Sequence, residues 1–284
     1  MRASALGFAL LLIAACTQAP LPAEPAIWHV TGNDAQEAWL FGTIHAAPAP
    51  LAWHSAAIDT ALSRSREVMV EVANIADDAA VARAFAALSH SPGLPPVEQR
   101  VAPAQRQALL AMLAVRGIKP DDLRDVETWA VALTLARPTS GSDPGNGVDR
   151  AVLAAAAGKP VVELEGASAQ LAIFDRLPEA DQRDLLGFVL ADAGAMDDDA
   201  DLVDVWRKGD ISRIDAETRT GLLGAPRLRE ALLTARNRRW TARIGQEMRA
   251  GRRPFVAVGA AHMTGRDGLV AMLQHAGYKV TRLQ

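Results

Sequence analysis

One short arrangement occurs near both ends of this chain and constrains its fold more than any other feature. Apolar runs end in GTIH (residues 42–45) and in GAAH (residues 259–262), and each is followed by a helix-like segment and a strand-like run. Glycine at the exit of a strand lets the backbone turn sharply. The sequence therefore contains a weak internal duplication of a strand, Gly-x-x-His, helix, strand unit, which predicts an α/β fold.

The place of the two motifs within these units predicts where a site would form. A crossover helix packs on its sheet, and ligands bind beyond the carboxyl ends of the strands. His45 and His262 both follow such ends. We expect the two terminal units to form one mixed sheet, covered by helices, in which the imidazoles meet. The large helical insert between them, roughly residues 75–250, would form a layer or cap over the cleft.

Histidine and glutamate supply the candidate chemistry at this edge. An imidazole can ligate a metal or move a proton near neutral pH, although a single histidine after a strand is commonly a structural hydrogen-bonding group. Glu71 lies at the carboxyl end of the alternating run EVMVEV (residues 67–72). In a sheet covered on both faces this carboxylate needs a metal, a cation or a hydrogen-bond partner, whereas on an open face it would meet water.

Four further polar residues are candidates to support such a site. Asn237 falls on the apolar side of a long predicted helix (residues 226–249), where it needs hydrogen-bond partners. Arg238 on the same helix could hold a carboxylate or an oxyanion, or form a surface ion pair. Asp149 lies in the first turn of a predicted helix, where the helix dipole alone would explain it. Glu165 lies at the end of a short predicted strand, which is a favourable place for a site.

The N-terminus predicts export. After a short positive start, an apolar stretch of about a dozen residues runs to Cys16 and is too short to span a bilayer permanently. The segment LIAAC (residues 12–16) resembles a bacterial lipobox, in which the cysteine is lipidated and becomes the new N-terminus. The alternative is an ordinary signal peptide that is cut elsewhere, for example after Ala19 or Ala23.

The N-terminal segment determines the domain organisation and the cellular location that we expect. We expect a signal peptide with a lipobox at residues 1–16, a tether rich in Pro and Ala at residues 17–25, and one domain at residues 26–284. The lipid anchor would hold the domain on the periplasmic side of a bacterial membrane. Thr17 after the cysteine is compatible with sorting to the outer membrane.

Composition excludes several classes of protein. Half of the 284 residues are hydrophobic and 22% are charged, which is typical of a globular protein with a sizeable core and not of a disordered or fibrous chain. The 30 basic and 33 acidic residues give a net charge of −3, which argues against a nucleic-acid partner. The single cysteine excludes an internal disulfide and a cysteine-rich metal site.

Several sequence blocks resemble a known family. The blocks are WLFGTIHAAP with EVMVEV, GVDRAVLAAAAGKPVVELEG, QLAIFDRLP, RNRRW and FVAVGAAHMTGRDGLVAMLQHAGYKVTRL. They resemble the TraB/GumN family, which is related to the Tiki metalloproteases and, more distantly, to the ChaN-like and erythromycin-esterase proteins. The similarity runs from residue 27 to residue 283, and the closing block and the paired motifs are its most specific parts.

The resemblance implies which residues form the site. The family pattern uses the two motif histidines and a strand-end glutamate, which match His45, His262 and Glu71. Arg238 and Asp149 match weaker family positions. The resemblance therefore predicts a two-histidine, one-carboxylate site, with Arg238 as a further catalytic residue.

One departure from the family concerns the strand-end glutamate that follows PVVEL. The family often has Glu-Thr at this point, whereas this chain has Glu-Gly at residues 165–166. The role of Glu165 is therefore left open. Asn237, Asp149 and Glu165 stay candidates for a supporting layer around the site.

From this resemblance we expect an exported, membrane-tethered hydrolase that depends on a metal and is peptidase-like. His45, His262 and Glu71 would bind one divalent ion, and mixed imidazole and carboxylate ligands suit Zn, Mn, Co or Fe. The ion would polarise the scissile carbonyl of a peptide or small-molecule substrate and activate a bound water. Arg238 or Asn237 would stabilise the oxyanion.

Two alternatives follow from the same relatives. In a variant without metal, Glu71 or a motif histidine would act as the general base toward water, as the relation to erythromycin esterases suggests. A non-catalytic protein would instead use the cleft to hold a metal or haem, or would assist surface polysaccharide assembly.

Overall fold

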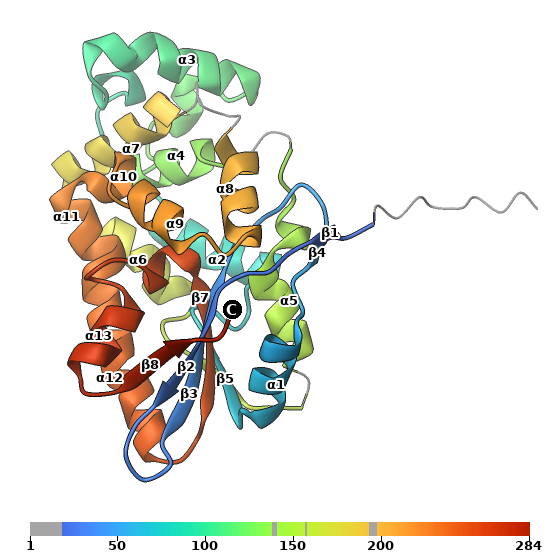
Figure 1. Cartoon of the computed structure of the whole chain (residues 1–284). Helices are drawn as coiled ribbons and strands as arrows, with labels where there is room; N and C mark the ends of the chain where they lie inside the picture. The colour runs from blue at the N-terminus through green and yellow to red at the C-terminus, as the bar shows by residue number, and fades with distance from the viewer. Residues whose placement is uncertain (1–18, 138–140, 157, 193–197) are drawn as a thin grey trace, which may run out of the picture.

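The computed structural model describes residues 19–137, 141–156, 158–192 and 198–284, so the predicted lipidation site Cys16 lies outside the described residues. The protein has a mixed α/β fold in which helices cover both faces of a six-stranded sheet (Figure 1). The strand order is β6 (Val161–Glu163), β5 (Glu67–Val70), β7 (Pro254–Gly259), β3 (Glu37–Thr43), β2 (Ile27–Thr31) and β8 (Lys279–Arg282). The predicted fold class, a mixed α/β protein, is confirmed.

The register of the sheet brings the two ends of the chain together. β2 and β3 form a hairpin, and β3 pairs in parallel with β7, with Thr43 opposite Gly259. β5 pairs in parallel with β7 on its other side, and β6 pairs in parallel with β5. β8 closes the sheet antiparallel to β2. The carboxyl ends of β3 and β7 are therefore neighbours, although more than two hundred residues separate them along the chain.

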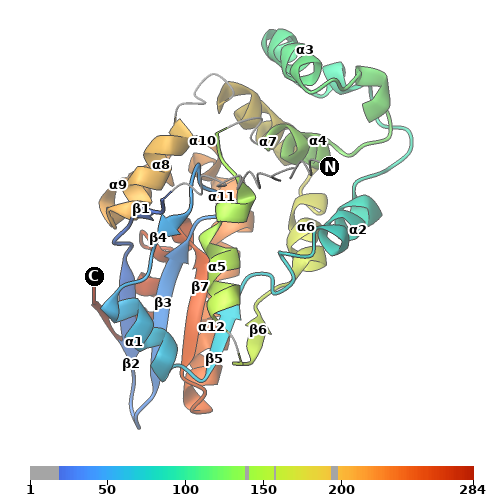
Figure 2. The ribbon, with the colours of Figure 1, turned by 90° about the vertical axis from the view of Figure 1, so that its right-hand side faces the viewer.

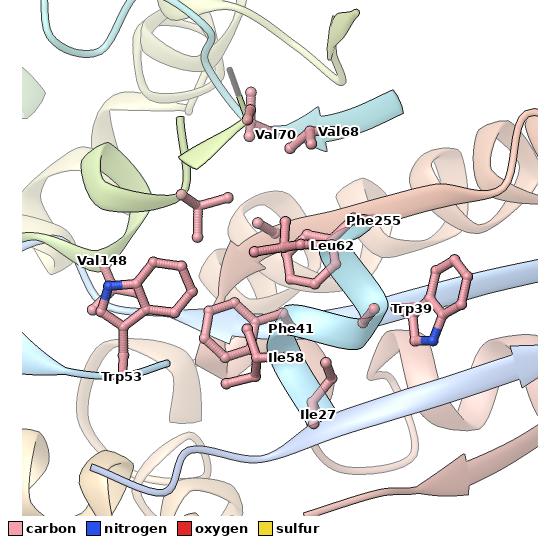
Figure 3. Packing of buried hydrophobic residues seen from close by; sticks show 14 of the residues in the cluster. Ile27, Trp39, Phe41, Trp53, Ile58, Leu62, Val68, Val70, Val148 and Phe255 are labelled. Carbon is pink, nitrogen blue, oxygen red and sulfur yellow. The ribbon is translucent and has the colours of Figure 1, made fainter. Parts of the chain in front are cut away.

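Two helices cover one face of the sheet. α1 (Ala56–Arg64) crosses from β3 to β5, and α5 (Val148–Ala155) packs beside it. Phe41 in β3 is fully buried against this layer (Figure 3), with ring centroids 5.6 Å from Trp53 and 5.7 Å from Phe255. These large aromatic contacts stabilise the end of the sheet from which residues 42–45 emerge.

Two other helices cover the opposite face. α12 (Ala235–Arg249) buries Trp240 and Ile244 against the sheet, and α13 (Leu269–His275) crosses from β7 to β8. The crossover through α1 and the crossover through α13 run in opposite directions across the sheet and use opposite faces. They therefore have the same hand, as parallel crossovers require.

The remaining helices form a second body at one end of the sheet (Figures 1 and 2). They are α2 (Asp78–Leu88), α3 (Arg106–Val115), α4 (Thr128–Leu135), α6 (Ala167–Asp175), α7 (Glu179–Asp192), α8 (Asp198–Arg207), α9 (Ile211–Glu217), α10 (Gly221–Gly224) and α11 (Pro226–Arg229). Most of them share a separate core around the fully buried Trp129. Within the described ranges, no helix has the length and apolar character needed to cross a bilayer.

Two segments differ from the sequence expectations. Ser55 caps α1 at Ala56, and β4 (Leu51–Ala52) before it pairs with β1 (Leu21–Pro22). The expected tether is therefore already paired at residues 21–22. The long helix predicted at residues 226–249 contains a π-helical turn, Glu230–Thr234, between α11 and α12.

The packing of Phe41 predicts a large effect of its truncation. Replacement by alanine removes a fully buried ring and leaves a cavity between two aromatic neighbours, so Phe41→Ala should lower the free energy of unfolding by about 3–5 kcal/mol. Urea denaturation measures this change. The matched control is Val115→Ala on α3, whose side chain is 74% exposed and should change stability by less than about 0.5 kcal/mol. Equal effects of the two substitutions would contradict this description of the core.

Candidate functional site

Both motif histidines and Glu71 converge beyond the ends of β3, β5 and β7. A Cβ atom built on Gly259 would lie 3.4 Å from Glu71 Oε1, 3.7 Å from His262 Cδ2 and 3.9 Å from His45 Nε2. One point in space is thus within 4 Å of all three side chains. The three side chains therefore lie around Gly259, where an added side chain would contact all of them.

Glycines also allow the backbone to bring these groups together. A Cβ on Gly42 would lie 2.9 Å from Ala260 Cα, so the end of β3 and the turn after β7 approach too closely for a side chain. A Cβ on Gly147 would lie 2.4 Å from the carbonyl oxygen of His45. This close approach places the first turn of α5 against residue 45, where Val148 N–H donates to the Ile44 carbonyl at 2.9 Å.

His45 is held by a carboxylate from α5. Its Nδ1 lies 2.6 Å from Asp149 Oδ2, and this hydrogen bond is the main cause that raises the pKa of His45, although burial opposes it. The ring is 63% exposed, and it lines the cavity described below. A carboxylate on Nδ1 fixes the tautomer that leaves Nε2 free to accept a proton.

His262 is held in a different state. Its Nδ1 lies 2.6 Å from Asn237 Oδ1, and the Asn237 amide donates to the backbone carbonyls of Asp267 and His262. Because the Asn237 amide nitrogen faces two carbonyl groups, the Asn237 side-chain oxygen accepts a hydrogen bond from His262 Nδ1–H. Burial is the main cause that lowers the pKa of His262 to about 3, and the nearby Arg236 acts in the same direction. His262 is therefore neutral at pH 7, with Nε2 as an acceptor.

Arg236 is the cation at the centre of the network. Its Nε and Nη2 donate to the Glu165 carboxylate at 2.8–3.1 Å, and Nη2 also donates to Glu71 Oε2 at 2.6 Å. Its Nη1 donates to the Leu232 carbonyl at 3.0 Å and lies 3.3 Å from His262 Nε2. A guanidinium has five N–H groups. These contacts use all five, so Arg236 has none left for a ligand.

Glu71 is a fixed anion. Its Oε1 accepts from the Gly259 backbone N–H at 2.8 Å, and its Oε2 accepts from Arg236 and from Gln170 Nε2 at 2.8 Å. Burial acts to raise the pKa of Glu71, but the imidazoles, the Arg236 guanidinium and the Gly259 N–H lower it to about 2. A carboxylate that is ionised at all physiological pH values and fully hydrogen-bonded is a poor proton acceptor.

A cavity of about 730 Å³ opens above these groups, between the sheet and the helical body. Its polar floor includes His45, Glu71, Gln170, Arg236 and His262. Apolar side chains from α4, α6, α8 and α9 line its walls. Concave sites of this volume, with a few convergent polar groups, commonly bind small ligands.

The structure brings most of the predicted site residues together and leaves one outside. Glu71, Glu165, His262 and Asn237 form one hydrogen-bonded network through Arg236, and the His45–Asp149 pair lies beside it. The expected place of Arg238 in the site needs correction, because its side chain is 58% exposed and pairs with Glu230 on the helix surface. The surface ion pair that the sequence left open is the arrangement found, and the guanidinium in the site belongs to Arg236.

Two site residues were not predicted from the sequence. Arg236 lies four residues after Leu232 and four before Trp240, so it occupies the gap in a four-residue series of buried positions on the long helix. That spacing indicates that the side chain of Arg236 points toward the interior. Gln170 on α6 reaches Glu71 only because the helical body folds over the end of β5, and we find no sequence signal for it.

The donor groups do not fit the expected divalent ion in this arrangement. Both Nδ1 atoms are held by acceptors, which would suit metal-binding imidazoles. However, His262 Nε2 lies against Arg236 Nη1, and both oxygens of Glu71 already accept N–H groups. Within the described ranges, no group of three or more His, Cys, Asp or Glu side chains is arranged to hold a metal.

One comparison with known proteins identifies a relationship. The model of the TraB/PrgY/gumN family matches residues 26–282, which is nearly the whole chain. The sequence is significantly similar to no curated protein and to no solved structure.

The charge state of Glu71 predicts how stability depends on pH. Its pKa falls from 4.5 to about 2 on folding, so its contribution is fully present above pH 4.5 and is lost as the pH falls toward 2. The stability difference between wild type and Glu71→Gln should therefore shrink from pH 6 to pH 3 in urea denaturation.

Glu67 on the same strand provides the control for this prediction. Burial raises the pKa of Glu67, with a contribution from Glu247, so its ionisation destabilises the folded state. Glu67→Gln should become more stable relative to wild type as the pH rises. The same sign of pH dependence for both variants would contradict the assigned charge states.

Proposed function

We propose that this chain, which belongs to the TraB/PrgY/gumN family, is an exported, membrane-tethered hydrolase that cleaves an ester or amide bond, such as a peptide bond, with an activated water. The observation that carries the proposal is the convergence of His45 Nε2, His262 and Glu71 beside Gly259 on the floor of the large cavity. A base, a fixed anion and a large cavity meet there, as hydrolysis requires.

His45 is the general base in this proposal. Among the described residues its Nε2 has no hydrogen-bond partner, its Nδ1 is fixed by Asp149, and its raised pKa makes the imidazole a stronger base. Glu71 is unsuited to this role, because its pKa is about 2 and its oxygens are occupied. Its negative charge instead stabilises the imidazolium that forms on His45.

The proposed reaction has two steps. Water attacks the carbonyl carbon while His45 Nε2 takes its proton, and the carbonyl oxygen becomes an oxyanion. The oxyanion then collapses, the bond to the leaving oxygen or nitrogen breaks, and His45 returns the proton to that atom. Gln170 lines the cavity and donates one amide N–H to Glu71, and its second N–H is the proposed donor to the oxyanion.

Arg236 is a positioning residue in this scheme. It binds Glu71, Glu165 and His262 at once, and its N–H groups are all occupied. Arg236 therefore holds Glu71 and His262 in place on the cavity floor and does not contact the substrate. Asn237 and Glu165 act one layer further out, by holding His262 and Arg236.

We further propose that the two Gly-x-x-His segments are halves of an old duplication. Each follows a parallel strand, and the two strands are neighbours in the sheet. Each half would contribute one imidazole, and the helical insert would contribute the cavity walls.

Loss of the base predicts loss of activity and a changed pH profile. His45→Ala should reduce kcat by about 10²–10⁴-fold. Asp149→Asn should lower kcat and shift the acidic limb of kcat/KM to lower pH, because it removes the hydrogen bond that raises the pKa of His45. Both are measured by steady-state kinetics with ester and peptide substrates.

The control for Asp149 is a second His–Asp pair at the same distance. His54 Nδ1 lies 2.6 Å from Asp59 Oδ1 on the exposed surface, so Asp59→Asn should leave the profile unchanged. Tight ligand binding without turnover by wild type would support the non-catalytic alternative instead.

The expected divalent ion can be tested directly. Because Arg236 and the backbone already occupy the acceptors of Glu71 and His262, we predict that chelation with EDTA leaves kcat/KM unchanged. Metal analysis of the purified protein gives a second measurement. Loss of activity on chelation and recovery with Zn, Mn, Co or Fe would show that a metal displaces Arg236 and would restore the metal-dependent mechanism.

The proposed lipid anchor at Cys16 predicts a membrane-bound protein on the periplasmic side, with the outer membrane favoured by Thr17. Wild type expressed in a bacterium should partition into the detergent phase, and Cys16→Ser should not, because it lacks the lipidated thiol. Fractionation of the two membranes tests the sorting. A wild-type protein in the aqueous phase, cleaved after Ala19 or Ala23, would contradict the anchor.

A further inference from the structure

The walls of the large cavity are apolar and come almost entirely from the helical body. They include Leu133 on α4, Phe174 on α6, Leu202 and Trp206 on α8, Ile214 on α9 and Leu232 in the π-helical turn. Leu202 remains 43% exposed although it is a large apolar side chain. An apolar group in the cavity would remove this surface from water, which is favourable.

The charges of the lining favour an uncharged ligand. All five N–H groups of Arg236 are engaged, and His262 is neutral. The wall carboxylate of Glu217 is paired with Arg213 at 2.8 Å. Among the described lining residues, no uncommitted guanidinium or ammonium is therefore left to bind a phosphate or carboxylate.

We propose that the substrate carries a long or bulky apolar group beside its scissile carbonyl, and that this group fills the space between α4, α6, α8 and α9. This inference rests on the proposed hydrolase function and specifies its substrate class. A fatty acyl ester and a peptide with apolar side chains share this chemistry. The volume of about 730 Å³ accommodates either.

The test compares p-nitrophenyl acetate with p-nitrophenyl octanoate. The octanoate should have the higher kcat/KM, and Leu202→Ser should lower the octanoate value about tenfold and the acetate value much less. The control is Leu110→Ser, because Leu110 is 44% exposed but does not line the cavity. A neutral peptide amide of leucine and phenylalanine is assayed in parallel. Its cleavage would indicate a peptide substrate, whereas cleavage of the octanoate alone would indicate a fatty acyl ester.

A binding measurement separates this inference from the proposed function. Octanamide should bind to His45→Ala, as measured by calorimetry, and binding should weaken in the double variant with Leu202→Ser. Binding without turnover in wild type would overturn the hydrolase and keep the ligand class. Turnover of the acetate without octanamide binding, or with equal rates for both esters, would overturn the ligand class and keep the hydrolase.

A separate observation concerns Thr43, the second residue of GTIH. Its side chain is 2% exposed, and its hydroxyl has no hydrogen-bond partner in the described structure. It lines a small cavity of about 20 Å³ together with His45, Glu71, Asp149 and Gln170. That volume is enough for one water molecule, which needs two to four polar partners. Four of these five residues also line the large cavity.

We infer that the Thr43 hydroxyl holds one water molecule beside His45, and that this is the water that attacks the carbonyl in the proposed reaction. The buried hydroxyl then gains its missing partner. Thr43 acts as a positioning residue for the oxygen, while His45 takes the proton.

Two substitutions test this role. Thr43→Val keeps the shape but removes the hydroxyl, so kcat should fall about 10²-fold with KM unchanged, and Thr43→Ser should restore most of it. Equal losses in both variants would indicate packing alone and overturn the inference, as would full activity of Thr43→Val. A high-resolution crystal structure should contain a water within hydrogen-bond distance of Thr43 Oγ1, whether or not wild type turns over the chosen substrate. A dry cavity would overturn the inference independently of the hydrolase proposal.

Discussion

The buried guanidinium of Arg236 is the interaction on which the rest of the site depends. It joins β5 through Glu71, the loop after β6 through Glu165, and the turn after β7 through His262. Removing one partner of a buried ion pair leaves an uncompensated charge, which is strongly destabilising. The network therefore fixes both the charge state of Glu71 and the neutral state of His262.

The sheet makes this network possible because it places distant segments side by side. β3 and β7 are parallel neighbours, so their carboxyl ends present His45 and His262 at the same edge. Glycine at residue 42 allows the close approach of the turn after β7, and glycine at residue 259 leaves room for the side chains of Glu71, His262 and His45 around it. The helical body then closes the space above and contributes the apolar walls.

Periodicity and turn chemistry were sufficient to predict much of this arrangement. The alternating run at residues 67–72 predicted Glu71 at the end of a strand, and the paired motifs predicted the meeting of His45 and His262. The direction of the side chains on the long helix was harder to predict. The sequence favours Arg238 as the site residue, whereas Arg236 occupies the site in the structure. The π-helical turn and the tertiary contacts with Glu71 and Glu165 that place Arg236 there cannot be derived from composition. Gln170 depends entirely on how α6 folds over the sheet.

A double-mutant cycle in kcat between His45→Ala and His262→Ala tests the central claim most directly. Groups that serve one reaction step as a unit lose activity non-additively. If the two imidazoles share one site, the double variant should be about as slow as the more damaged single variant. Independent, multiplying losses would contradict a common site at the ends of β3 and β7.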